Sequence, residues 1–284
     1  MIPLEFEYTR AKSLKDALNA VAAGDGTKLL AGGHSLIPVL RFRLAQPAKL
    51  VDIGDLAELK GIEAKARSVR IGAASTYRDV LESDIIAERY PLLVEAVTGI
   101  GDLQVRNKGT LGGGLAHADP ASDLPAVMLA LGATFELRSK SGKRSVAAGD
   151  FFQGPFTTAM RADEILVDIL LPAAPKKAGM AYVAFEQKAS GYALAGAAAV
   201  VTRTRKTIAS VTVALTGVGE KAYVADVSGA VGTQADDPAL SAAVANVTAG
   251  ITVNNDIHAS TEYRSHLARV AAKRAIALAY SRAG

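Results

Sequence analysis

The chain has 284 residues, of which 50% are hydrophobic and 21% charged, and it contains no cysteine. This composition excludes a disordered or collagen-like chain, and the length suffices for about two domains. The lack of cysteine excludes disulfides, thiolate zinc sites, iron–sulfur clusters held by this chain and a cysteine nucleophile. The net charge is only +4 and tryptophan is absent, so we expect no nucleic-acid interface.

Nothing in the sequence indicates a membrane or an export signal. The first residues lack a basic region followed by an apolar core. The longest apolar stretch, near residues 193–201, is too short to span a bilayer. We therefore expect a cytoplasmic protein without a membrane span.

The first 60 residues alternate helix and strand patterns. Leu14, Ala17, Leu18 and Val21 have helical spacing behind Ser13, a candidate N-cap. A short strand follows at 28–31, then a short helix at 36–42 and a strand at 49–52. This order predicts an opening similar to a βαβ unit.

The remaining elements point to an α+β fold. We expect a strand at 69–73 and helices at 77–81, 92–98 and 123–131. Strands are expected at 134–138, 165–171, 181–186, 194–202 and 208–216, and a helix at 258–281 with Tyr263, Leu267 and Val270 as its apolar stripe. The Pro- and Lys-rich residues 172–177 indicate a domain boundary. Strands mixed with terminal helices favour α+β over a regular doubly wound sheet.

The first glycine-rich segment is Gly32-Gly33-His34-Ser35, between a strand and the start of a helix. Glycines there permit positive φ and bring the backbone close to a ligand. Successive N–H groups can form a nest that suits a phosphate. A tight turn without a ligand is the alternative interpretation.

The second segment, residues 108–125, contains three adjacent glycines at 112–114, and we interpret it as a second ligand loop. Ordering three glycines costs conformational entropy, so we expect the backbone to approach something closely. Thr110, Ser122 and Asp123 offer polar partners for ribityl or ribose oxygens. Ser122 alternatively serves only as the N-cap of the next helix.

Several familiar sites are not favoured. Neither G-x-G-x-x-G nor G-x-x-x-x-G-K-[ST] occurs, which disfavours a Rossmann dinucleotide site and a P-loop. His34 and His117 lack further ligands at a metal-binding spacing, so we expect no metal. No G-x-S-x-G motif supports a serine hydrolase. Two phosphate-type segments without these motifs indicate a less common dinucleotide site.

Both segments resemble the FAD-binding loops of the molybdenum hydroxylases, in particular the medium subunit of carbon monoxide dehydrogenase and its relatives. The similarity rests on residues 31–38 and 110–125 and continues through 150–156, 163–166, 189–193 and 262–268. It covers essentially the whole chain. One position departs from the pattern, because relatives usually carry Asn or Ser where this chain has Gly114. A side-chain hydrogen bond to FAD is then expected to be missing.

The resemblance implies an FAD-binding fold of two α+β subdomains, at 1–56 and 57–176, and a smaller C-terminal α+β domain at 177–284. It implies FAD as the cofactor and no catalytic side chain in this chain. The pyrophosphate would bind Leu30, Ala31, Gly32, Gly33, His34, Ser35 and Leu36. The ribityl and flavin would lie along Thr110, Gly113, Gly114 and His117, with Ser122 and Asp123 on polar parts of the cofactor. Leu166 would pack on the ring system, and Lys188 or Tyr192 would sit beside it. For Tyr192, an ordinary strand position is the alternative.

The same resemblance implies partner subunits. A large subunit would carry the molybdenum cofactor and a small one two [2Fe–2S] clusters, in a dimer of heterotrimers. FAD would take electrons from the clusters and pass them to an external acceptor, which could be NAD, a quinone, oxygen or another carrier. Carbon monoxide, an N-heterocycle and an aldehyde remain open as substrates. The alternatives are a free-standing FAD-dependent oxidase or reductase and a non-catalytic nucleotide-binding assembly subunit.

Overall fold

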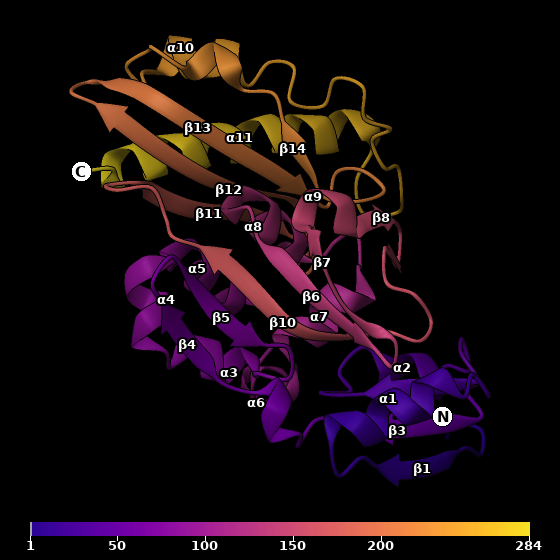
Figure 1. Cartoon of the computed structure of the whole chain (residues 1–284). Helices are drawn as coiled ribbons and strands as arrows, with labels where there is room; N and C mark the ends of the chain where they lie inside the picture. The colour runs from indigo at the N-terminus through magenta and orange to yellow at the C-terminus, as the bar shows by residue number, and fades with distance from the viewer. Residues whose placement is uncertain (1) are drawn as a thin grey trace.

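Three main β-sheets follow one another along the chain in the computed structural model, which describes residues 2–284 (Figure 1). The N-terminal sheet is parallel, and the middle and C-terminal sheets are antiparallel. Helices lie beside all three sheets, so the expected α+β class is confirmed. The domain boundaries expected from the sequence stay a prediction.

The N-terminal sheet has the strand order β1–β3–β2 and confirms the opening similar to a βαβ unit. Helix α1 forms because Leu14, Ala17 and Val21 share a buried face and the Ser13 side chain accepts from the Asp16 N–H. The elements are β1 (Glu7–Arg10), α1 (Leu14–Ala22), β2 (Thr27–Leu30), α2 (Leu36–Arg41), β3 (Lys49–Asp52) and the 3₁₀ turn η1 (Ala57–Leu59).

The middle sheet has the order β4–β5–β10–β6–β7, with helices packed on one face. Its strands are β4 (Ile62–Lys65), β5 (Ser68–Gly72), β6 (Thr134–Ser139), β7 (Gly142–Ala147) and β10 (Ile165–Pro172), and a small hairpin joins β8 (Phe152–Gly154) to β9 (Thr157–Thr158). Its helices are α3 (Tyr77–Leu81), α4 (Asp84–Arg89), α5 (Pro91–Gly99), α6 (Leu103–Lys108), α7 (Leu111–His117), α8 (Asp123–Leu131) and α9 (Ala148–Phe151).

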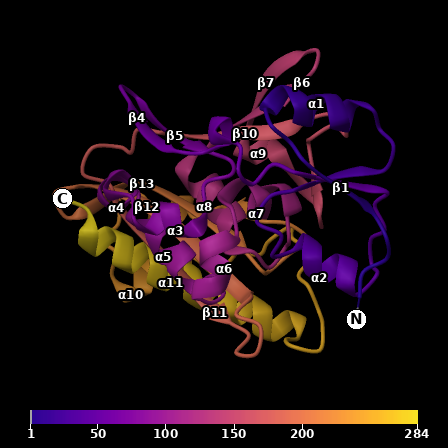
Figure 2. The same ribbon diagram turned by 90° about the horizontal axis from the view of Figure 1, so that it is seen from below.

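The second glycine segment is not the open loop that we expected. Residues 111–117 form helix α7, and Gly112, Gly113 and Gly114 lie inside it. The helix forms because the Thr110 side chain accepts from the Gly113 N–H at 3.1 Å and because Leu111 and Leu115, four residues apart, are fully buried. The loop prediction was wrong for these residues. In both views α7 lies on the side of the middle region that faces α2 (Figure 1, Figure 2).

The C-terminal sheet has the order β11–β12–β13–β14 and is covered on both faces (Figure 1). Helices α5 and α8 pack on one face, and the long helix α11 packs on the other. The elements are β11 (Gly179–Glu186), β12 (Ala193–Thr204), β13 (Thr207–Thr216), β14 (Tyr223–Ala225), η2 (Ser228–Ala230), α10 (Asp237–Ala243) and α11 (Thr261–Arg282). Strand β12 is rich in alanine, which lets both layers of helices approach it closely.

The predicted apolar stripe of α11 was wrong at Tyr263, which is 52% exposed. The buried face instead carries Leu267, Ile276 and a row of alanines, because small side chains allow the helix to lie close to β11 and β12. Among residues 2–284, no helix is both long and apolar enough to cross a membrane.

Strand β10 joins two hydrophobic cores. Ile165 and Val167 belong to the core beneath the N-terminal sheet, and Leu166, Ile169 and Leu171 belong to the largest core. The largest core extends from the middle sheet to one face of the C-terminal sheet. Strand β10 therefore links the core beneath the N-terminal sheet to the core beneath α7 and α8.

Candidate functional site

The first glycine segment connects β2 to α2 and touches the second segment. A Cβ atom at Gly32 would overlap the carbonyl oxygen of Lys108, just before α7, so only glycine fits there. Gly33 has φ = +77°, which L side chains rarely adopt. The fold thus brings the two segments together, although 76 positions separate Gly32 from Lys108 in the sequence.

Five adjacent backbone N–H groups in this segment have no acceptor among residues 2–284. They belong to Gly32, Gly33, His34, Ser35 and Leu36. The only side-chain contact within the run joins His34 Nδ1 to the Gly32 carbonyl oxygen, 2.9 Å apart. Successive N–H groups without a protein acceptor can form a nest for an anion with several oxygens.

The three glycines of α7 have different surroundings. A Cβ at Gly112 would lie 2.5 Å from the Ala73 Cβ, so this glycine allows α7 to pack against its own chain. Gly113 is exposed, and a Cβ there would meet only the Thr110 side chain. Gly114 is half-buried and lies against Tyr77. A Cβ at Gly113 would lie only 2.6 Å from the Thr110 hydroxyl oxygen, so the close approach that we expected is to protein at all three positions.

The turn after α7 is held by the C-terminal sheet. Its first residue, Ala118, has left-handed backbone angles. The buried Thr216 hydroxyl lies 2.6 Å from the Ser122 carbonyl oxygen and 3.1 Å from that of Pro120. The N–H of Gly217 donates to the same Pro120 carbonyl. These contacts fix the approach of the chain to α8.

Asp123, the first residue of α8, is 8% exposed and accepts a hydrogen bond from the Tyr182 hydroxyl. The pKa of Asp123 is raised to about 6, mainly by burial and also by the nearby Glu186 carboxylate, against the opposing effect of the Tyr182 hydrogen bond. Burial also raises the pKa of Tyr182, so its phenol stays protonated. Asp123 can therefore gain or lose a proton close to neutral pH.

Three further polar residues expected at the site have free or weakly engaged side chains. His117 is half-buried, its ring centroid lies 5.0 Å from that of Phe156, and burial lowers its pKa, so the neutral imidazole predominates at pH 7. Ser122 is at the N-cap position of α8, but its side chain makes no capping hydrogen bond. The Ser35 side chain does not cap α2 either.

The remaining expected residues lie at different depths. Leu166 is 4% exposed and belongs to the largest core. Tyr192 is 46% exposed, and its pKa is raised by partial burial and by the nearby carboxylates of Asp119 and Asp123. Lys188 is exposed and forms no hydrogen bond or ion pair with residues 2–284. The fold thus groups Tyr192 with Asp123 but does not hold Lys188 in place.

Sequence reasoning missed Tyr77, Tyr182 and Thr216. Each contacts the second segment from a distant part of the sequence: Tyr77 lies against Gly114, Tyr182 binds Asp123, and Thr216 binds the turn before α8. No local motif marks these residues, because their contacts depend on how the sheets pack. Only the fold reveals them.

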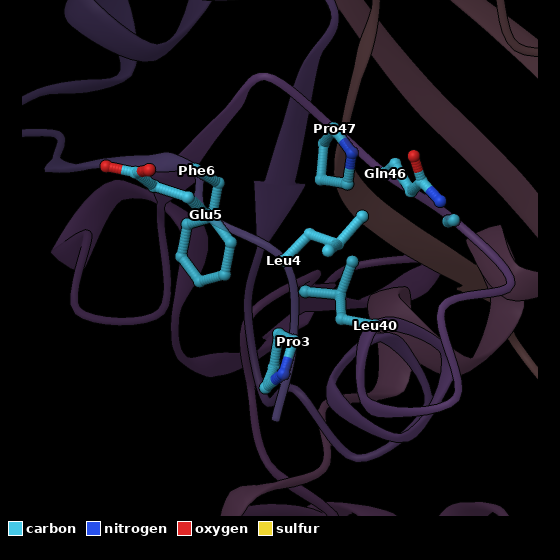
Figure 3. A pocket seen from close by; sticks show the side chains of 8 residues that line it. Pro3, Leu4, Glu5, Phe6, Leu40, Gln46 and Pro47 are labelled. Atoms are coloured by element: carbon cyan, nitrogen blue, oxygen red, sulfur yellow. The ribbon is translucent and has the colours of Figure 1, made fainter. Parts of the chain in front are cut away.

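Two cavities lie away from this site. A small pocket of about 10 Å³ is enclosed by the N-terminal residues and the segment after α2, where Leu4, Leu40 and Pro47 face one another (Figure 3). That volume accommodates about one water molecule. An open groove of about 330 Å³ lies between α1 and the turn that joins β6 to β7. Neither contains a residue that we expected to bind the cofactor.

Comparison with known proteins gives matches over nearly the whole chain. Residues 4–174 match the family described as the FAD binding domain in molybdopterin dehydrogenase, and residues 180–279 match the CO dehydrogenase flavoprotein C-terminal domain. The carbon monoxide dehydrogenase medium chain of Afipia carboxidovorans is 40% identical over 100% of this chain and 99% of its own. The glyceraldehyde dehydrogenase medium chain of Sulfolobus acidocaldarius is 39% identical, over 95% of this chain and 96% of its own.

Solved structures show the same fold. Carbon monoxide dehydrogenase from Hydrogenophaga pseudoflava matches with a TM-score of 0.96 at 37% identity, over 100% of both chains. Quinoline 2-oxidoreductase from Pseudomonas putida matches with a TM-score of 0.95 at 33% identity, over 100% of this chain and 99% of that one. The chain therefore belongs to the family of FAD-binding medium subunits of molybdenum hydroxylases, as the resemblance of its glycine segments implies.

Proposed function

We propose that this chain carries FAD and acts as the electron-transfer subunit of a molybdenum-containing dehydrogenase. The observation that supports this most directly is the nest at residues 32–36, in contact with Lys108 at the end of α6. Five unpartnered N–H groups match the oxygens of a pyrophosphate, so the residues present fit the cofactor that the family binds. Bound FAD supplies the redox chemistry, because it accepts electrons singly, holds two and passes them on.

We assign the binding roles as the resemblance implies. Leu30 to Leu36 bind the pyrophosphate through the backbone. Thr110, Gly113, Gly114 and His117 line the ribityl and flavin portions, and Ser122 offers its unpartnered hydroxyl. Asp123 presents a carboxyl group that Tyr182 orients. Leu166, Lys188 and Tyr192 are assigned to the ring system, and Tyr192 is better placed for this than Lys188 because it lies beside Asp123.

The partners follow from the same family. A large subunit would hold the molybdenum cofactor and a small subunit two [2Fe–2S] clusters, consistent with the absence of cysteine here. The names of the relatives include carbon monoxide, glyceraldehyde and quinoline enzymes, so the substrate class stays open. A dimer of heterotrimers, the external electron acceptor and a cytoplasmic location also stay predictions. A free-standing oxidase is less favoured, because the full-length relatives are medium subunits.

The visible absorption spectrum of the protein, purified with whatever subunits accompany it, tests the proposal. We expect flavin bands, FAD among the small molecules released by heat, and additional iron–sulfur absorption if the small subunit is retained. Apoprotein should also take up added FAD. A colourless protein that fails to bind added FAD would contradict the proposal. Turnover of a substrate by the isolated chain would instead support the free-standing oxidase.

A further inference from the structure

Tyr77 lies under the second glycine segment and determines which residues that segment can contain. It is the first residue of α3, and a Cβ atom at Gly109 would lie 2.7 Å from its ring atom Cε2. At the other end of the same ring, a Cβ at Gly114 would lie 2.5 Å from the hydroxyl oxygen. The ring therefore extends from Gly109 to Gly114, and both positions accept it because they lack a side chain.

The Tyr77 hydroxyl has no hydrogen-bond partner among residues 2–284, although the residue is only 7% exposed. Two other tyrosines of this region do have partners: the buried Tyr90 donates to carbonyl oxygens of β10, and the half-buried Tyr182 donates to Asp123. A phenol that loses water on burial and gains no partner is unfavourable. Its oxygen is not among the fully buried atoms, so it keeps a small exposed area.

The surroundings keep this phenol in the donor state. Burial raises the pKa of Tyr77, and the nearby Tyr192 hydroxyl and Asp123 carboxyl raise it further. The Tyr192 hydroxyl and the Asp123 carboxyl therefore lie in the same region as the Tyr77 hydroxyl, which itself contacts Gly114. Of these, Asp123 already has a hydrogen-bond donor, while the hydroxyl of Tyr77 is uncommitted.

We propose that Tyr77 is a cofactor-binding residue, whose hydroxyl donates a hydrogen bond to an oxygen or nitrogen of FAD, and that Gly114 is the residue that makes room for it. The inference rests on the proposed placement of FAD along α7. It also explains why this chain has Gly114 where relatives usually carry Asn or Ser. The Tyr77 hydroxyl occupies the space that a side chain at position 114 would fill, and it donates the hydrogen bond to the cofactor instead.

Tyr77→Phe tests the hydrogen bond, because it keeps the ring and removes only the hydroxyl. We measure the FAD dissociation constant of the apoprotein, together with the flavin absorption maxima and midpoint potential of the reconstituted protein. FAD should bind about tenfold more weakly, with shifted maxima and potential, while the apoprotein keeps its melting temperature or gains a little, because an unpartnered buried hydroxyl is removed. Tyr90→Phe is the matched control, since it lowers stability but should leave the flavin properties unchanged.

The outcomes separate this inference from the proposed function. If the native protein binds FAD and Tyr77→Phe binds it with the same constant, spectrum and potential, Tyr77 has only a packing role and the inference is wrong. If the native protein does not bind FAD, the proposed function itself fails.

Gly114→Ser and the double variant provide an independent test. In the single variant the serine Cβ collides with the Tyr77 hydroxyl, so FAD affinity and melting temperature should both fall. With Phe at 77 the nearest ring atom is Cζ at 3.7 Å, an ordinary contact, and Leu124 Cδ1 at 3.2 Å is the end of a flexible side chain. The double variant should therefore bind FAD more tightly than Gly114→Ser. Additive losses in the double variant would contradict the proposed pairing of residues 77 and 114.

Discussion

Gly33 shows how a single backbone angle controls the nest. Its φ of +77° lies in the left-handed region, and valine at this position would resist that angle and collide with Ile37, whose Cγ1 would lie 3.0 Å from the new Cβ atom. We predict that Gly33→Val lowers FAD affinity at least tenfold. Gly24→Val is the control, because Gly24 has φ = +81° with no atom within 4 Å of its Cβ position. Both variants should lose stability, but only the first should lose flavin, as measured by FAD titration.

Asp123 should make the stability of the apoprotein depend on pH. Its pKa rises from 3.8 to about 6 on folding, mainly through burial, so the folded state binds the proton more tightly than the unfolded state. The associated stability is present below pH 4 and is lost as the pH rises through 6, a difference of about 3 kcal/mol. Asp123→Asn should therefore be more stable than the native apoprotein at pH 7 and equal to it near pH 4, in urea unfolding.

The control for this pH dependence has the opposite sign. Hydrogen bonds from Ser228 lower the pKa of Asp226 in the folded state, so its ionised form contributes stability at neutral pH that is lost in acid. Asp226→Asn should consequently be less stable than the native protein at pH 7. A pH-independent effect of Asp123→Asn would show that its carboxyl does not titrate in this range. We also expect Asp123→Asn to bind FAD more weakly, because it replaces a proposed contact.

At the scale of elements, Thr216 at the end of β13 should position the turn before α8. Thr216→Val removes the hydroxyl that bonds the carbonyl oxygens of Pro120 and Ser122 but keeps the shape of the side chain. We predict a loss of about 1–3 kcal/mol in the free energy of unfolding, because the part-buried Ser122 carbonyl loses this donor while the Pro120 carbonyl keeps only the Gly217 N–H, and we predict FAD binding several-fold weaker. Thr212→Val on the same strand is the control, since the Thr212 hydroxyl makes no hydrogen bond within residues 2–284. Equal effects of the two variants would contradict this role.

Elements with clear apolar spacing could be predicted from the sequence, and those with unusual composition could not. Leu14, Ala17 and Val21 predicted α1 correctly, because their spacing matches the buried face. Helix α7 was missed, because the low helix propensity of three glycines conceals the helix signals of the Thr110 cap and the Leu111–Leu115 pair. The face of α11 was misplaced, because alanines carry little hydrophobic signal although they pack tightly.

The site shows the same division between local and distant information. Gly32 and Gly33 could be identified from the sequence around them. The structure adds that the backbone N–H groups of this segment have no acceptor among residues 2–284, which makes them available to a ligand. Tyr77 and Tyr182 could not be identified in this way. They become visible only in the fold, where Tyr77 of α3 lies against Gly114 and Tyr182 of β11 donates a hydrogen bond to Asp123. A resemblance to known loops finds the backbone contacts of a cofactor but not the side chains that reach it from other elements.

At the scale of the whole molecule, we expect strand β12 to influence the proposed FAD site from one of its faces only. Ala198 pairs with Ala214 and belongs to the core that includes Val127 and Met128 of α8. Its neighbour Ala199 belongs to the core beneath α11. Both alanines are fully buried, so enlarging either one should destabilise the fold by about 1–3 kcal/mol.

The two faces should nevertheless differ in their effect on FAD. Ala198→Leu pushes against α8, whose first residue is Asp123, so we predict several-fold weaker FAD binding in addition to the loss of stability. Ala199→Leu pushes against α11, which carries none of the proposed FAD contacts, and its FAD affinity should stay near the native value. FAD titration well below the melting temperature of each variant separates binding from unfolding. If both variants lost FAD equally, the cofactor site would depend on the sheet as one rigid unit, and α8 would have no separate role in positioning Asp123.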